Sequence, residues 1–142
     1  MLRAVLDANV FVSAAIRPEG PPGQILRLFL CDEAFELVLS PAIVTEIATA
    51  LAYPAVRKCL HAPIDTCQWL DSLLLLSDLV EDGALSSQVS QDPDDDKYLH
   101  AAVSGRASVI VSGDKHLLAL DDYEGIHIAL PRAFLAMLGA GK

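Results

Sequence analysis

The chain has 142 residues, 53% of them hydrophobic, and it carries 19 acidic side chains against 10 basic ones. This length suits one domain with a sizeable core, and the apolar content excludes an intrinsically disordered chain. A formal charge of −9 argues against a broad basic face that holds nucleic acid tightly, although a few local bases can still contact phosphate. Because no apolar run approaches a membrane span and no secretory signal is recognisable, we expect a single cytoplasmic domain over residues 1–142.

The first part of the chain alternates strand and helix patterns. Its predicted elements are a strand over 3–7, a helix over 9–16, a turn-rich loop over 17–23, a helix over 24–30, a strand over 35–40 and a helix over 41–51. Ser40 and Pro41 mark the start of the last helix, because Ser is a favoured N-cap and Pro a favoured first helical residue.

The remainder of the chain continues this alternation. Its predicted elements are helices over 55–60 and 65–76, a weak strand over 78–81, a helix with an acidic start that ends at 105, strands over 107–112 and 125–130, and a helix over 131–138. Such alternation predicts right-handed crossovers and a mainly parallel sheet with helices on both faces. The working site of such a sheet lies at the carboxyl ends of its strands, where Asp7, Ser40 and Asp114 should share one end.

Asp7 ends the first apolar run and is followed two residues later by Asn9. A carboxylate beside a buried strand is costly to desolvate unless a cation, a partner side chain or a helix N-terminus compensates it. Two interpretations of Asp7 therefore stand, a helix N-cap and a functional ligand. Asn9 fits both, as a turn residue or as a supporting donor.

Glu46 lies just beyond one edge of the apolar stripe of its predicted helix. That stripe consists of Ile43, Val44, Ile47, Ala48 and Leu51. A single helical glutamate is more often a solvated surface residue, and its place at the edge of the stripe only weakens that interpretation.

Four aspartates precede or begin the predicted helix that ends at Gly105: Asp92, Asp94, Asp95 and Asp96. Several like charges within five residues repel one another and need either a cation or generous exposure to water. Asp96 immediately precedes an apolar face, which favours its pointing toward the sheet. That face consists of Leu99, Ala102 and Val103. A solvated acidic cap remains an alternative for Asp92 and Asp94.

Asp114 also suits a simple helix cap, but capping accounts poorly for three acids that converge at one end of one sheet. Hard divalent ions such as Mg²⁺ and Mn²⁺ prefer oxygen ligands. Two such ions about 4 Å apart can activate water and neutralise a leaving oxygen during phosphodiester hydrolysis. The acids therefore favour a metal-dependent hydrolase.

The histidines and cysteines give no competing site. His61, His100, His116 and His127 lack the spacings of common metal motifs, so we interpret them as surface or packing residues. The three cysteines form no Cys-x-x-Cys pair, which predicts buried free thiols in a reducing compartment. They are Cys31, Cys59 and Cys67.

Five segments together resemble a PIN domain of the VapC-like ribonuclease group, the toxin components of bacterial and archaeal toxin–antitoxin pairs. They read "VLDANVFVSAAI", "LVLSPAIVTEIATAL", "DPDDDKYLHAAV", "VIVSGDKHLL" and "PRAFLAML". The resemblance covers nearly the whole chain. It implies a three-layer α/β/α sandwich with a central mainly parallel sheet. It also implies an endoribonuclease that uses Mg²⁺ or Mn²⁺ and leaves a 5′-phosphate and a 3′-hydroxyl, pairs as a homodimer and is silenced by an antitoxin protein.

The resemblance also assigns roles to residues. The catalytic and metal-binding acids would be Asp7, Glu46, Asp96 and Asp114, with Asp95 as a further metal ligand and a second candidate for the third acid. Supporting roles would fall to Asn9, Ser112 and Asp92. Separately, the local bases that are best placed for RNA contacts are Arg17 in the first loop, Lys97 beside the acid cluster, and Lys115 with His116 after Asp114.

Two other functions stay open on the sequence. A haloacid-dehalogenase-like phosphatase also begins with a strand that ends in Asp, but it needs an acid where this chain has Asn9. A non-enzymatic interaction module would follow if the acids only cap helices. The apolar segments 25–30 and 73–76 favour a dimer, because they carry more aliphatic surface than one helix face needs, and filling a single core is the alternative.

Overall fold

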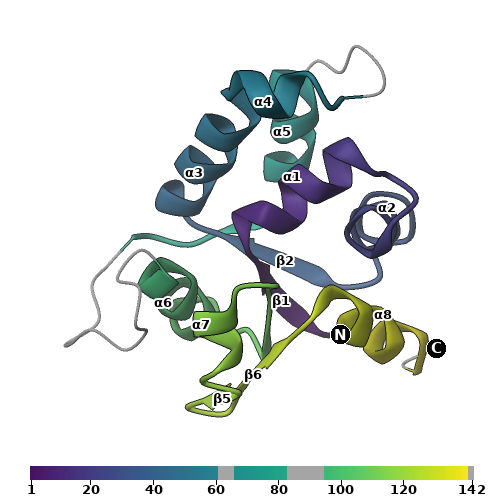
Figure 1. The fold of residues 1–142 in the computed structure, drawn as a ribbon. Helices are drawn as coiled ribbons and strands as arrows, with labels where there is room; N and C mark the ends of the chain where they lie inside the picture. Colours follow the sequence, from purple (N-terminus) through teal and green to yellow (C-terminus); the bar gives the residue numbers. More distant parts are fainter. Residues whose placement is uncertain (61–65, 83–94, 141–142) are drawn as a thin grey trace.

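The computed structural model describes residues 1–60, 66–82 and 95–140, which form a six-stranded sheet flanked by helices (Figure 1). The strands are β1 (Arg3–Leu6), β2 (Glu36–Leu39), β3 (Asp78–Leu79), β4 (Val109–Val111), β5 (Asp122–Tyr123) and β6 (Ile126–Ala129). They lie in the order β3-β2-β1-β4-β6-β5. All neighbouring pairs are parallel except β5 and β6, which are antiparallel. The predicted α/β class with a mainly parallel sheet is therefore confirmed.

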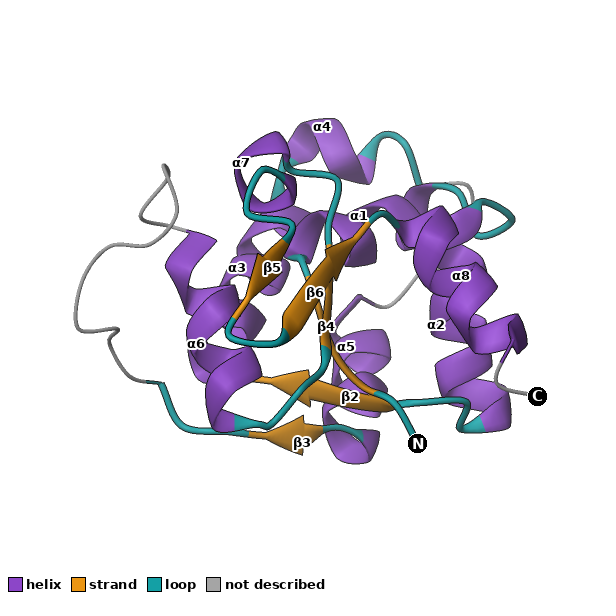
Figure 2. Ribbon diagram, turned by 90° about the horizontal axis from the view of Figure 1, so that it is seen from below, coloured by secondary structure: helices purple, strands orange, loops and turns teal. Residues whose placement is uncertain are grey.

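The helices connect these strands and cover the sheet. They are α1 (Ala8–Ile16), α2 (Pro21–Asp32), α3 (Pro41–Ala52), α4 (Pro54–Arg57), α5 (Thr66–Leu76), α6 (Asp96–Ser104), α7 (Lys115–Leu118) and α8 (Pro131–Ala140). Helix α6 packs on β1, β2 and β4, while α2 packs with α1 and α8 on the other side of the strands (Figure 2). The central strands are thus covered on both faces.

Burial explains why the central strands read as unbroken apolar runs. Ala4, Val5 and Leu6 of β1 have no exposed surface, because parallel strands between two helical layers have no solvent face. Beside them, the ring of Phe35 packs against those of Phe29 and Phe134, with centroids 5.4 and 5.1 Å away. These contacts join α2, the start of β2 and α8 in one core.

Most predicted boundaries agree with the structure, and α2 is an exception. The helix begins at Pro21, inside the stretch predicted as a loop, because proline is well suited to the first helical turn. Gly23 allows this turn to pass close to the preceding loop, since a Cβ atom there would lie 2.0 Å from the carbonyl oxygen of Pro18. Any side chain at position 23 would displace the start of α2.

The sequence prediction missed β5 and α7, which are both very short. Strand β5 pairs with β6 through a tight turn in which Glu124 and Gly125 have φ angles of 50° and 83°. Two consecutive positive φ angles are typical of the type I′ turns that connect hairpins. The pairing comes from this turn, because two residues carry too little pattern to indicate a strand.

The expectation of buried cysteines is wrong. Cys31, Cys59 and Cys67 are all exposed. Cys31 lies in the last turn of α2, where larger apolar residues such as Leu26 and Phe29 already fill the buried side. A small thiol on the opposite side of a helix therefore stays in solvent.

The two apolar segments that favoured a dimer, 25–30 and 73–76, differ in how far they are buried. In the segment 25–30, the core takes up Ile25, Leu26 and Phe29. In the segment 73–76, Leu73 is fully buried, but Leu75 is 84% exposed and Leu76 is 51% exposed. None of the helices in the part of the chain that the structure describes combines the length and apolar character of a membrane span.

Candidate active site

The site forms where the carboxyl ends of β1 and β4 lie side by side. Leu6 pairs with Val111 in this parallel ladder, and the next backbone N–H, that of Asp7, donates to the carbonyl oxygen of Val111 over 3.0 Å. Asp7 follows β1 and Ser112 follows β4. The shared register therefore brings these two side chains together, as parallel strands predict.

Asp7 is a buried carboxylate that is held on both oxygens. It is 3% exposed, its Oδ1 accepts the backbone N–H of Asn9 over 3.0 Å, and its Oδ2 accepts the Ser112 hydroxyl over 2.7 Å. Burial raises the pKa of Asp7, the bonds from Asn9 and Ser112 act in the opposite direction, and the charge of Glu46 raises it further. Asp7 is thus both the N-cap of α1 and a carboxylate whose charge a cation would stabilise.

Ser112 connects Asp7 to Asp114. Ser112 has no exposed surface, and its Oγ accepts the backbone N–H of Asp114 over 2.9 Å. The Oδ1 of Asp114 in turn accepts the backbone N–H of His116 over 2.7 Å and lies 3.8 Å from the Nδ1 of that residue. Asp114 therefore caps α7 with one oxygen, and the other stays available for a further contact.

Asp95 approaches the same place from α6. It stands at the N-cap position of α6, yet its side chain makes no capping bond there, and it is 6% exposed. Within the described ranges, one atom from each of Asp95, Asp114 and His116 lies within 4.8 Å of the others, a spacing that one metal ion can bridge. Two carboxylates and an imidazole suit a divalent ion, with the imidazole more favourable for Mn²⁺ than for Mg²⁺.

The structure gives the inward position on α6 to Asp95. The buried face of this helix consists of Asp95 before its start and of Tyr98, Leu99, Ala101 and Ala102 within it. Asp96 is half-buried, and Val103, which the sequence argument placed on the buried face, is 42% exposed. The apolar face is therefore rotated from the expected one, which moves the inward carboxylate back by one residue.

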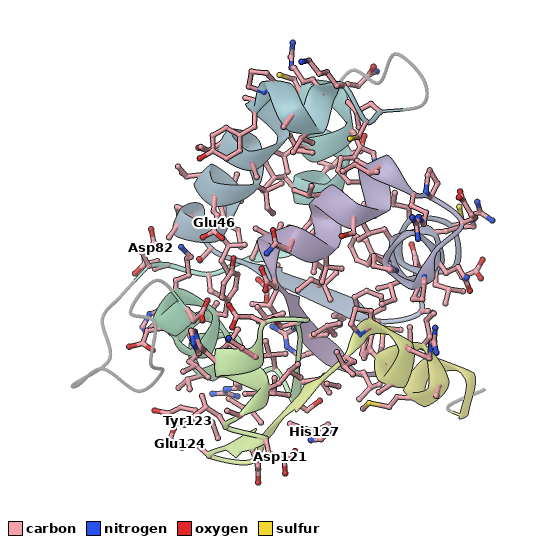
Figure 3. The ribbon with its side chains drawn as sticks, in the orientation of Figure 1. Glu46, Asp82, Asp121, Tyr123, Glu124 and His127 are labelled. Atoms are coloured by element: carbon pink, nitrogen blue, oxygen red, sulfur yellow. The ribbon has the colours of Figure 1, made fainter. Side chains whose placement is uncertain are left out.

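Glu46 reaches the site from α3 and is held by two consecutive residues of α6. Its side chain lies near the start of α6, between the two helices (Figure 3). The Tyr98 hydroxyl donates to Oε1 of Glu46 over 2.8 Å, and Nζ of Lys97 forms an ion pair with Oε2. Glu46 is thus a half-buried edge residue of α3, as its place beside the apolar stripe indicated.

Tyr98 is the residue that the sequence argument missed. Its hydroxyl accepts the backbone N–H of Ala8 over 3.1 Å, and the residue is 1% exposed. Burial raises the pKa of Tyr98, and the nearby charges of Asp7 and Glu46 raise it further, so the phenol stays protonated. The available signal was its spacing, because a residue three positions after Asp95 lies on the same helical face.

The remaining candidates divide into near and distant residues. Asn9 is exposed and contacts Asp7 through its backbone N–H, while Lys115 is exposed directly after Asp114. Arg17 is exposed at the far end of α1, about 13 Å along the helix from its start, so the fold does not bring it to the acids. Asp92 and Asp94 lie outside the described residues.

The chain is similar to a family model and to several known proteins. The model described as "PIN domain" matches residues 3–116. The "Uncharacterized protein MJ1680" of Methanocaldococcus jannaschii is 32% identical over 136 residues, which cover 92% of this chain and 86% of that protein.

Two solved structures share the fold. The crystal structure of PAE2754 from Pyrobaculum aerophilum gives a TM-score of 0.62 at 19% identity and covers 98% of this chain and 90% of that one. The crystal structure of VapBC2 from Rickettsia felis, bound to a DNA fragment from their promoter, gives a TM-score of 0.59 at 12% identity. It covers 89% of this chain and 97% of that one. Together with the family model, which spans most of the sequence, these findings show that the chain belongs to the PIN domain family, whose members are generally nucleases.

Proposed function

We propose that this chain is a metal-dependent endoribonuclease and the toxin of a toxin–antitoxin pair. The observation that carries this proposal is the meeting of Asp95, Asp114 and His116 beside the buried Asp7 at the end of the parallel sheet. Capping alone explains neither the buried carboxylate of Asp95 nor its approach to Asp114. Family membership supports a nuclease, and the VapBC2 structure supports the toxin assignment.

The donor set fits a divalent cation. Asp95 and Asp114 would hold it with His116, and Asp7 and Glu46 would complete the ring of carboxylates, with Asp96 a further candidate. A bound Mg²⁺ or Mn²⁺ ion lowers the pKa of a water molecule and neutralises charge on the scissile phosphate. The donors themselves are mostly oxygens, as these hard ions require.

The other residues of the site position these acids and the substrate. Ser112 keeps Asp7 and the backbone of Asp114 at a fixed separation through its two hydrogen bonds. Lys97 and Lys115 place positive charge beside an otherwise negative site, where it can attract a phosphate. A haloacid-dehalogenase-like phosphatase needs an acidic residue at position 9, where this chain has asparagine, so that alternative loses support.

Partners follow from the same proposal. An antitoxin protein would cover the acidic site, and a homodimer would bury exposed apolar residues such as Leu75 and Leu76. Light scattering should give twice the 15.2 kDa mass of one chain, whereas a monomer at every concentration would exclude the dimer. Co-expression with any small open reading frame that neighbours the gene tests the antitoxin, which is excluded if no peptide co-purifies and nuclease activity is undiminished.

RNA cleavage with and without chelator tests the activity. We expect a single-stranded RNA to be cut in Mn²⁺ or Mg²⁺, with 5′-phosphate and 3′-hydroxyl ends, and to stay intact in EDTA. Asp7→Asn should abolish the cut, while Asp71→Asn, a matched change at an exposed position of α5, should not. Cleavage that persists in EDTA, or that both variants retain, would refute the proposal.

A further inference from the structure

The hydroxyl of Tyr98 bridges the start of α1 and a side chain of α3. It accepts the N–H of Ala8 over 3.1 Å and donates its single hydrogen to Oε1 of Glu46 over 2.8 Å. The ring is 1% exposed within the core, so the position of the hydroxyl is fixed by packing. The bridge therefore ties Glu46 to the end of β1, where Asp7 begins the next helix.

Glu46 differs from Asp7 in how it is held. Asp7 has a short side chain, is buried and accepts a bond on each oxygen. Glu46 has a longer side chain that is 37% exposed, and more of its rotamers are open to it in solvent. Lys97 also contacts it, but that ammonium stands on a flexible stem. The rigid anchor for Glu46 is the phenol.

We propose that Tyr98 is a positioning residue, whose hydroxyl holds the carboxylate of Glu46 where it can serve as a metal ligand next to Asp7. The inference rests on the proposed function, because it assigns Tyr98 a role through an acid of that site. Groups that orient metal ligands typically change metal affinity by 10- to 100-fold when they are removed.

A purely structural role predicts something different. If the hydroxyl served only the N–H of Ala8 or the neighbouring carboxylate of Asp7, its loss would affect the protein equally whether or not Glu46 is present. If it acts through Glu46, its loss should matter only while Glu46 is there. A double-mutant cycle separates these two cases.

The cycle measures Mn²⁺ affinity by calorimetry on the full chain without RNA. We expect Tyr98→Phe to weaken binding by about tenfold in the wild-type background and by less than about twofold in Glu46→Ala. Tyr53→Phe, at an exposed position, is the matched control and should leave the affinity unchanged. In RNA cleavage, Tyr98→Phe should lower kcat while KM changes little, because the phenol is buried away from bound substrate.

A second measurement leaves the hydroxyl in place. The chain has three tyrosines, so 3-fluorotyrosine labelling gives three fluorine resonances, and Tyr53→Phe and Tyr123→Phe assign that of Tyr98 by elimination. We expect Mg²⁺ to shift the Tyr98 resonance in the wild type and not in Glu46→Ala.

Two results would overturn the role of Tyr98 and leave the proposed function standing. One is an equal loss of Mn²⁺ affinity from Tyr98→Phe in the wild type and in Glu46→Ala. The other is a Tyr98 resonance that stays unshifted in a wild-type chain that binds Mg²⁺. A wild-type chain that binds neither ion would overturn the proposed function together with the inference.

Discussion

Ser112 donates its hydroxyl hydrogen to Oδ2 of Asp7 over 2.7 Å, and this bond joins the ends of two neighbouring strands, β4 and β1. The same oxygen of Ser112 accepts the N–H of Asp114. One buried hydroxyl therefore fixes how two acids, Asp7 and Asp114, lie relative to each other. Asp7 and Ser112, which this bond joins, are 105 residues apart in the sequence. The organisation of the site follows from the register of the sheet.

Replacing Ser112 with alanine should destabilise the fold. The change leaves one oxygen of a buried carboxylate and one backbone N–H without their partner, so we expect the free energy of unfolding to fall by about 1–3 kcal/mol. Urea denaturation in EDTA measures the loss. Ser108→Ala, at an exposed position, is the control, and equal effects of the two changes would contradict the account.

Replacing Asp7 with asparagine should leave the metal-free fold as stable as before, or more stable. Asn cannot carry the charge that burial opposes, and removing one of several like charges relieves repulsion. We expect cleavage to be lost and the melting temperature in EDTA to be unchanged or raised. A large fall in melting temperature would show that Asp7 is mainly a structural cap.

The pH dependence of stability should carry the signature of the raised pKa of Asp7. A raised carboxyl pKa means that the folded state binds more protons than the unfolded state above the ordinary value of 3.8, so this group's contribution to stability falls as pH rises. The unfolding free energy of the wild type minus that of Asp7→Asn, both in EDTA, should therefore fall from pH 4 toward neutral pH, as the variant becomes the more stable of the two. A wild-type-minus-variant value that rises over that range would contradict the raised pKa.

Asp95 and Asp96 can be separated by single substitutions. Asp95→Asn removes the buried carboxylate beside Asp114 and should weaken Mn²⁺ binding by at least about a hundredfold, whereas Asp96→Asn should weaken it by less than about tenfold. Calorimetry measures both affinities without RNA. The opposite ranking would return the third-acid role to Asp96, as the sequence argument preferred.

The local bases should account for part of the salt dependence of RNA binding. Neutralising Lys97 and Lys115 together should reduce the slope of log affinity against log salt by about 1.4, since each phosphate contact with a single strand contributes about 0.7. Binding is measured with Asp7→Asn to prevent cleavage. The control is Arg57→Gln with Lys58→Gln, two exposed charges on another helix end. Equal slopes for the two double variants would rule out these lysines.

The sequence predicted the helices, strands and strand ends better than the contacts between residues far apart in the chain. Strand-end positions located Asp7, Ser40 and Asp114, and the structure bears out Ser40 as the N-cap of α3. The apolar pattern of α6 is too short to fix the rotation of the helix about its axis. It therefore favours Asp96 as the carboxylate that points inward, whereas the structure buries Asp95. The Tyr98 bridge depends on contacts with residues 52 and 90 positions away, which no local pattern encodes.

A crystal of the full chain soaked in Mn²⁺ and measured for anomalous scattering tests the central claim most directly. The account predicts an anomalous peak among the side chains of Asp95, Asp114 and His116, on the side that Asp7 faces, and no peak there in Asp95→Asn crystals. Well-ordered wild-type crystals with no anomalous peak at these acids, in a chain that still cleaves RNA, would contradict it.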